Sequence, residues 1–201
     1  MIPILLALAA LWSAGCGSVF PKSQPSRFFA LSPLSQAADS TEHSRQISLG
    51  IGPVRLPGYL DRQEIMTRVA PNRFVALEYD RWAEPLDENF THVLAQNLST
   101  LLGTDQILAY PWPPDKKPRY RVEIQVLRFE YNSAREAELW ARWTVIDVSG
   151  KENPSSKESR LTRAATENSV DGSVAALSET VGDLSREIAR TVITIAGQRE
   201  P

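Results

Sequence analysis

The chain has 201 residues and a formal net charge of −2, with 42% hydrophobic and 23% charged residues. These proportions are ordinary for a globular protein and exclude a disordered or fibrous chain. The longest basic run is the pair Lys116 and Lys117, with no zinc-finger or aromatic–basic motif, which argues against nucleic acid as a partner. The length suits one domain with a substantial core.

An apolar run from Ile4 to Trp12 is followed by Ser13, Ala14, Gly15 and the only cysteine, Cys16. The run is too short to cross a bilayer but has the length of a signal-peptide core. Small residues directly before a cysteine are typical of a bacterial lipoprotein signal. We therefore expect removal of residues 1–15 and a diacylglycerol plus an N-acyl chain on Cys16, with no other cofactor.

Two features depart from the usual lipoprotein signal. Ser13 stands where leucine is most common, and neither Lys nor Arg precedes Cys16. An ordinary cysteine at the end of a secretory signal, or in a short membrane helix, is the alternative. Gly17, in place of an aspartate after the cysteine, favours the outer membrane over the inner membrane, with the domain facing the periplasm. Prolines and small polar residues predict a lipidated tether at 16–26, ahead of one globular domain at 27–198.

The first half of the domain predicts four short strands, because apolar residues alternate or cluster between turn signals. The strands are expected at residues 28–31, 47–56, 65–69 and 74–77. Pro53 predicts a bulge or an end in the second strand, since proline has no N–H for a sheet. The third and fourth strands flank residues 70–73 and are expected to form a hairpin.

Residues 85–103 predict the first helix. Pro85 suits a first helical turn, and Gly103 suits the position after the last turn. Between them, apolar residues recur at three- and four-residue steps and would share one helical face. This face consists of Leu86, Phe90, Val93, Leu94, Leu98 and Leu101.

The second half predicts four more strands, at residues 107–110, 120–129, 139–148 and 157–166. In the second of these the alternation reverses at Leu127, which predicts a bulge. The third is apolar on both faces, as in a central strand, and the polar fourth suits an edge of the sheet.

Residues 171–196 predict a long amphipathic helix, because an apolar stripe runs along their whole length. Packing of the stripe against a sheet is the expected arrangement. A coiled coil with a partner helix is the alternative that the same spacing allows.

Aromatic residues with arginine neighbours on loops are typical anchors of protein interfaces. The candidate partner-interface residues are Tyr59, Arg62, Arg81, Trp82 and Trp112. Two of them have a plain structural alternative, in which Trp82 caps the first helix and Tyr59 fills the edge of the core.

Catalytic and metal-binding residues are not expected. His43 and His92 have no second ligand at metal spacing, and the chain has neither a phosphate-binding loop nor a nucleophile elbow. Acidic pairs such as Asp87 and Glu88 flank predicted helices and strands, and the ordinary explanation for them is a solvent-exposed face of such an element. An enzyme would need polar groups that converge on a pocket, and the sequence proposes no such set.

Several stretches resemble the ABC-type transport auxiliary lipoprotein family. They are residues 56–65 (LPGYLDRQEI), 81–86 (RWAEPL), 110–111, 120–130 and 139–143. The resemblance runs from about Phe28 to Ile195, and the RWAEPL stretch is its most specific part.

This resemblance implies a three-layer α/β fold, with a mixed, roughly five-stranded sheet and helices on both faces. It also implies a non-enzymatic accessory lipoprotein that docks a periplasmic assembly of MCE-domain proteins at the outer membrane. Its partners would be the MCE-domain protein, the ABC permease system for lipids or hydrophobic compounds, the membrane through the anchor, and other copies of itself.

Two further functions are compatible with the residues. A stand-alone periplasmic lipid-binding lipoprotein would need an apolar pocket of roughly a few hundred Å³. A cell-envelope hydrolase or wall-binding module would need a polar constellation, and it ranks last.

Overall fold

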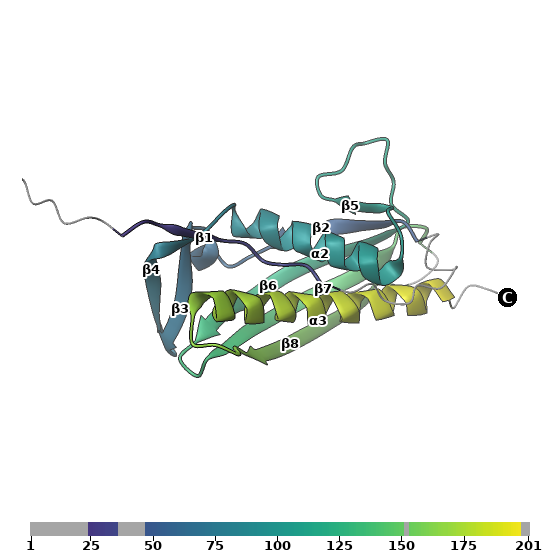
Figure 1. Cartoon of the computed structure of the whole chain (residues 1–201). Coiled ribbons are helices and arrows are strands. Elements are labelled where there is room, and N and C mark those ends of the chain that lie inside the picture. The colour runs from purple at the N-terminus through teal and green to yellow at the C-terminus, as the bar shows by residue number, and fades with distance from the viewer. Residues whose placement is uncertain (1–23, 36–46, 151–152, 198–201) are drawn as a thin grey trace, which may run out of the picture.

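A computed structural model of the chain describes residues 24–35, 47–150 and 153–197. This part holds eight strands, two long helices and one 3₁₀ turn (Figure 1). The strands are β1 (Arg27–Phe29), β2 (Leu49–Arg55), β3 (Glu64–Ala70), β4 (Arg73–Trp82), β5 (Ile107–Ala109), β6 (Tyr120–Asn132), β7 (Glu136–Asp147) and β8 (Ser155–Ala164). The helices are α2 (Leu86–Leu102) and α3 (Val170–Gly197), and the 3₁₀ turn is η2 (Gly58–Leu60).

All eight strands join in one mixed sheet, organised around the long strand β6. The antiparallel partner β7 follows one edge of β6 for almost its whole length, and β8 continues the sheet beyond β7. β2 and β3 both run parallel to β6, and they share its other edge because β7 occupies the first one. β2 pairs with the first half of β6, and β3 pairs with its last two residues, Tyr131 and Asn132. The sheet is thus interrupted between β2 and β3.

Both long helices lie side by side over the same face of the sheet (Figure 1). Burial along β6 shows which face this is: Tyr120, Val122 and Ile124 are buried, whereas Glu123 and Gln125 are exposed. The expectation of roughly five strands is wrong, since the sheet has eight. Helices on both faces are not confirmed, because both helices of the described residues lie on the same face. The other face of the sheet carries polar side chains such as Glu123 and Gln125, which do not need cover.

Most local predictions are confirmed. The predicted hairpin is the antiparallel pair β3–β4, and α2 ends at Gly103, which has the left-handed φ of 59°. The register of β6 shifts between Val126 and Arg128, at the predicted reversal, and that of β2 shifts around Pro53. β8 pairs only with β7 and is an edge strand, as its polarity indicates.

The apolar stripe of α3 packs on β6, β7, β8 and α2, which confirms the sheet-packing interpretation for this helix. Phe90 of α2 meets Phe129 of β6 edge to face, with ring centroids 5.4 Å apart. Such aromatic pairs contribute about 1 kcal/mol beyond the burial of their area. In the described residues, no helix combines the length and the apolarity needed to span a membrane.

Residues 30–35, the strap, run from β1 between the two helices (Figure 1). The backbone N–H groups of Leu31 and Leu34 donate to the side-chain amide oxygens of Asn89 and Asn97, at 2.7 Å each. Both asparagines are buried in α2. Buried amides need partners, so their presence on an otherwise apolar helix face is explained by the strap.

The other side of the strap is held by α3. The N–H of Ser32 donates to Ser178 Oγ at 3.0 Å. A Cβ on Gly182 would come 2.7 Å from Leu34 Cδ2, so the glycine lets the Leu34 side chain lie directly against α3. The strap therefore fills the groove between α2 and α3 and attaches the N-terminal end of the domain to both helices.

Candidate partner-binding site

A pocket opens where the sheet is interrupted. β2 ends at Arg55 and β3 begins at Glu64, and residues 56–63 leave the sheet between them. The connection from β4 to α2 forms the opposite wall, and the cavity between the two walls has a volume of about 600 Å³. It is lined by residues 54–58, 60–63 and 82–87.

The first wall is shaped by the η2 turn. Pro57 precedes the turn, and its carbonyl accepts the N–H of Leu60 at 2.9 Å. The carbonyl of Gly58 accepts the N–H of Asp61 at 3.2 Å. This turn buries Leu60 and leaves Asp61 and Arg62 exposed at the edge of the pocket.

Tyr59 points away from the cavity and fastens the turn to the sheet. Its ring stacks on Phe74 of β4, with centroids 4.6 Å apart, and its hydroxyl donates to Glu130 Oε2 at 2.7 Å. Burial, reinforced by the bond to Glu130, raises the pKa of Tyr59 far above its usual value. The phenol therefore stays protonated and remains the donor over the whole physiological pH range.

The carboxylate of Glu130 on β6 has no solvent exposure. The guanidinium of Arg68 donates to both of its oxygens and lies 4.2 Å over the ring of Phe74, and Arg128 Nε is 3.5 Å from Oε1. The bond to Glu130 raises the pKa of Arg68. A buried charge with so many partners is compensated, so we assign Glu130 to holding residues 56–63 against the sheet.

The second wall begins with Trp82, which is only 5% exposed. Its backbone N–H donates to the backbone carbonyl of Gln63 at 2.7 Å, and this bond joins the two walls of the pocket. The N–H of Ala83 donates to the carbonyl of Phe29 at 2.8 Å. Three segments that are distant in sequence therefore meet at the end of β4.

Glu84 connects the pocket to the strap. Its Oε1 accepts a bond of 2.6 Å from Asn89 Nδ2, and its Oε2 is 3.7 Å from His92 Nδ1. The amide oxygen of Asn89, Oδ1, accepts a hydrogen bond from the backbone N–H of Leu31. One buried amide thus links the position of the strap to the wall of the pocket.

The pocket combines an apolar interior with a charged margin. Leu60, Trp82 and Leu86 are buried, while Arg62 and Asp87 are exposed. This distribution matches a protein-interaction site, where an apolar centre is surrounded by polar groups. No group of three or more His, Cys, Asp or Glu residues in the described ranges could hold a metal ion.

Three of the predicted interface residues belong to this site. Arg62 is exposed at its margin, and Trp82 forms part of its buried wall, at the entrance to α2. Tyr59 supports the site from behind and fills an edge of the core, which is the structural alternative foreseen for it. Of the three, only Arg62 is freely accessible to a partner.

The other two predicted residues lie elsewhere. Arg81 is half-buried on β4, in register with Glu64 of β3 and Phe28 of β1. Trp112 lies in the loop after β5, with its ring centroid 5.5 Å from that of Tyr110. The structure does not bring Trp112 to the pocket.

The cluster around Glu130 was missed by sequence reasoning. Glu130 follows the bulge of β6, where the alternation is disturbed, and its partner Arg68 lies 62 residues away. The only signal in the sequence was the reversal of the apolar–polar alternation at Leu127, which indicates that the side chains after it point to the opposite face of the sheet.

Residues 1–23, with Cys16, and residues 36–46, with His43, lie outside the described ranges. The expectations for the signal, the acyl chains and the start of the tether are therefore predictions.

A family model described as the ABC-type transport auxiliary lipoprotein component matches residues 29–189. Among curated proteins, the chain is similar to the intermembrane transport lipoprotein PqiC of Escherichia coli K12 and of Shigella flexneri, with 30% identity to each over 98 residues. These residues are 49% of this chain and 51% of each relative, so the match spans about half the length of PqiC.

Solved structures show the same fold. One, the crystal structure of an uncharacterized protein, has a TM-score of 0.68 and 17% identity, with 84% of this chain and 99% of that chain covered. Another, protein XCC0632 from Xanthomonas campestris, has a TM-score of 0.67 and 16% identity, with 86% and 98% covered. At such identities the likeness establishes the fold alone.

Proposed function

Because the chain belongs to the family of ABC-type transport auxiliary lipoprotein components, we propose that it is a non-enzymatic, membrane-anchored accessory protein of an envelope transport system. In this role it docks a periplasmic assembly of MCE-domain proteins at the outer membrane, beside the path of lipids or other hydrophobic compounds. The family is defined by transport, and not by a class of enzyme.

One observation carries the proposal. Residues 56–65 and 81–86 are two of the stretches that resemble the family, and 81–86 is the most specific of them. They contribute the opposite walls of a single pocket and are joined by the backbone hydrogen bond from Trp82 to Gln63. An apolar interior with a charged margin suits a partner that inserts one apolar side chain and pairs its charges around it. We therefore place the contact with the MCE assembly at this pocket.

Arg62→Glu tests the docking site, because Arg62 is exposed at the margin and its replacement leaves the pocket walls in place. The affinity of the lipidated protein for the purified MCE-domain protein should fall by about tenfold or more, because the reversed charge would oppose the partner group that Arg62 faces. Arg73→Glu, an equal charge reversal at the exposed β3–β4 turn, is the matched control and should bind normally.

Two outcomes would contradict the proposal. If wild-type protein captured no MCE or ABC component under mild crosslinking, the transport role would be wrong. If Arg62→Glu and Arg73→Glu bound equally well, the pocket would not be the docking site.

The anchor is tested separately. Mass spectrometry of the N-terminal peptide should show an acylated Cys16, and Cys16→Ala should leave the domain folded but lose the anchor. Several acyl chains buried together make such an anchor stable, since each CH₂ contributes about 0.8 kcal/mol. A peptide that starts at Met1 and carries no fatty acid would remove the basis for outer-membrane attachment.

A stand-alone lipid-binding lipoprotein is the second candidate, because the cavity of about 600 Å³ has the size of a ligand pocket. The charged residues Asp61, Arg62 and Asp87 around it suit an acyl chain poorly. Native mass spectrometry after exposure to phospholipid decides between the two: a docking protein holds no stoichiometric lipid, whereas a carrier does.

A further inference from the structure

A basic loop, residues 110–119, projects from the domain between β5 and β6 (Figure 1). It carries Lys116, Lys117 and Arg119 against the single acid Asp115, and these four residues are exposed. The chain as a whole has a net charge of −2, so the loop is a local concentration of positive charge. Neither the docking pocket nor the core explains it.

The base of the loop is held in a fixed position on β2. The N–H of Tyr110 donates to the carbonyl of Ile51 at 2.8 Å. A Cβ on Gly50 would come 2.7 Å from Pro118 and 3.0 Å from Trp112, so the glycine lets both side chains lie directly on the strand.

Four prolines, Pro111, Pro113, Pro114 and Pro118, limit the freedom of the rest of the loop. A loop that is ordered before binding loses little conformational entropy when it binds.

The loop also exposes apolar groups. Tyr110 is 56% exposed, and Pro113 and Pro114 are exposed as well. Tyrosine at the level of the headgroups, with lysine and arginine near the phosphates, is the combination that a bilayer surface favours. Trp112, which could have anchored a protein interface, is instead packed on Gly50.

We propose that the basic loop contacts the headgroups of anionic phospholipids in the membrane that carries the lipid anchor. This inference rests on the proposed anchoring at Cys16. A single anchor plus a second, electrostatic contact would hold the domain in one orientation on the membrane, where a flexible tether alone would not.

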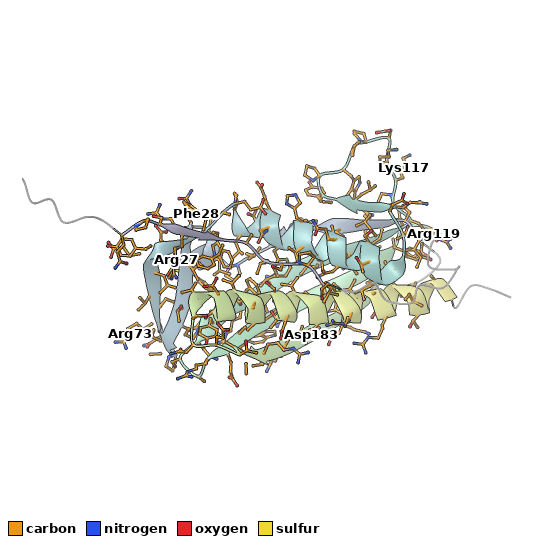
Figure 2. The ribbon with its side chains drawn as sticks, in the orientation of Figure 1. Arg27, Phe28, Arg73, Lys117, Arg119 and Asp183 are labelled. Carbon is orange, nitrogen blue, oxygen red and sulfur yellow. The ribbon has the colours of Figure 1, made fainter. Side chains whose placement is uncertain are left out.

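The dimensions of the chain allow this contact. Arg27 and Phe28 lie at one end of the molecule, and Lys117 and Arg119 lie at the other (Figure 2). The 28 residues of α3 between these ends span about 42 Å. The chain from Cys16 to Arg27 reaches at most about 40 Å when extended. The domain can therefore lie along the bilayer, with Phe28, 64% exposed, at the tethered end and Tyr110 at the far end.

Hydrogen exchange on vesicles tests the inference. The lipidated full-length protein is bound to vesicles of phosphatidylcholine alone or of phosphatidylcholine with phosphatidylglycerol. The amides of residues 110–119 should exchange more slowly on the anionic vesicles only, and high salt should reverse the effect. Lys116→Gln with Lys117→Gln should weaken the contact by a factor of about 5 per lysine and remove the protection. Arg73→Gln, at the opposite end (Figure 2), should retain it.

Two other results would overturn the inference. Equal exchange on both vesicle types would show that the loop does not touch lipid. Protection that appears only when the purified MCE-domain protein is added would make the loop a protein contact. Co-flotation with pure phosphatidylcholine vesicles reports the acyl anchor independently of the loop. Absence of co-flotation would contradict the proposed anchoring at Cys16, whereas normal co-flotation with unchanged exchange of residues 110–119 would contradict only the lipid contact of the loop.

Discussion

Two of the grooves in the described part of the molecule differ in what fills them. The groove between α2 and α3 is occupied by the strap of the same chain, whose N–H groups bond to Asn89, Asn97 and Ser178. The pocket between residues 56–63 and 82–87 is lined by comparable apolar side chains but is open, with charged residues at its margin.

The difference shows how burial and polarity separate a structural groove from a binding site. In the first groove, buried amides are matched to fixed backbone partners, so an external ligand would have to replace every bond. In the second, the polar groups are at the solvent edge and can exchange water for a partner at little cost. Asn89 contacts both Glu84 and the strap, so the two grooves share one residue.

The largest effect is expected from Trp82→Ala, which removes the wall shared by the pocket and the core. Large-to-small substitution of a buried aromatic residue destabilises by about 3–5 kcal/mol. Urea unfolding measures it, and Arg62→Ala at the margin should stay within about 0.5 kcal/mol of wild type. A normal free energy of unfolding for Trp82→Ala, with binding lost, would instead make Trp82 a contact residue.

Asn97→Ala should destabilise the filled groove by about 1–3 kcal/mol, because it leaves the N–H of Leu34 without its acceptor. Ser185 Oγ also loses the bond of 3.1 Å from Asn97. Hydrogen exchange at residues 31–35 should accelerate. Gln96→Ala, an exposed change on the same helix, is the control. Unchanged exchange of the strap would show that Asn97 does not hold it.

Tyr59→Phe should lower the free energy of unfolding by about 1 kcal/mol at neutral pH, because one buried hydrogen bond is lost. The pKa of Tyr59 is raised on folding, so its stabilising contribution is complete below the unfolded value of about 10 and is lost as pH rises above it. Wild-type stability should therefore fall more steeply than that of Tyr59→Phe under alkaline conditions. Parallel alkaline profiles would contradict the role assigned to this phenol.

The smallest effect is expected outside both grooves, on the uncovered face of the sheet. The hydrogen bond from Arg142 is the main cause that lowers the pKa of Glu158, with smaller contributions from Trp140 and Arg160. The corresponding stabilisation is present above the unfolded pKa and is lost as pH falls through the folded one. NMR titration should show a higher pKa for Glu158 in Arg142→Met with little change in stability, as for any exposed pair. An unchanged titration would leave Arg142 without this role.

Much of the candidate site was within reach of sequence reasoning. Arg62 and Trp82 stood out because aromatic residues and arginines lie together there in segments expected to be loops, which is typical of interface anchors. Their meeting at one pocket was not predictable, since it depends on the bond from Trp82 to Gln63 and on the pairing of β3 with β4. Trp112 had the same local signal and lies elsewhere.

The sequence by itself determined the elements: eight strand segments and two long amphipathic helices are visible in the period of apolar residues, which depends only on near neighbours in the chain. Only the tertiary structure decided how these elements combine. β2 and β3 share one edge of β6, both helices cover one face, and the strap meets side chains 58, 146 and 63 residues away in the chain. Such contacts join residues far apart in the sequence, and no local pattern encodes which distant partner is chosen.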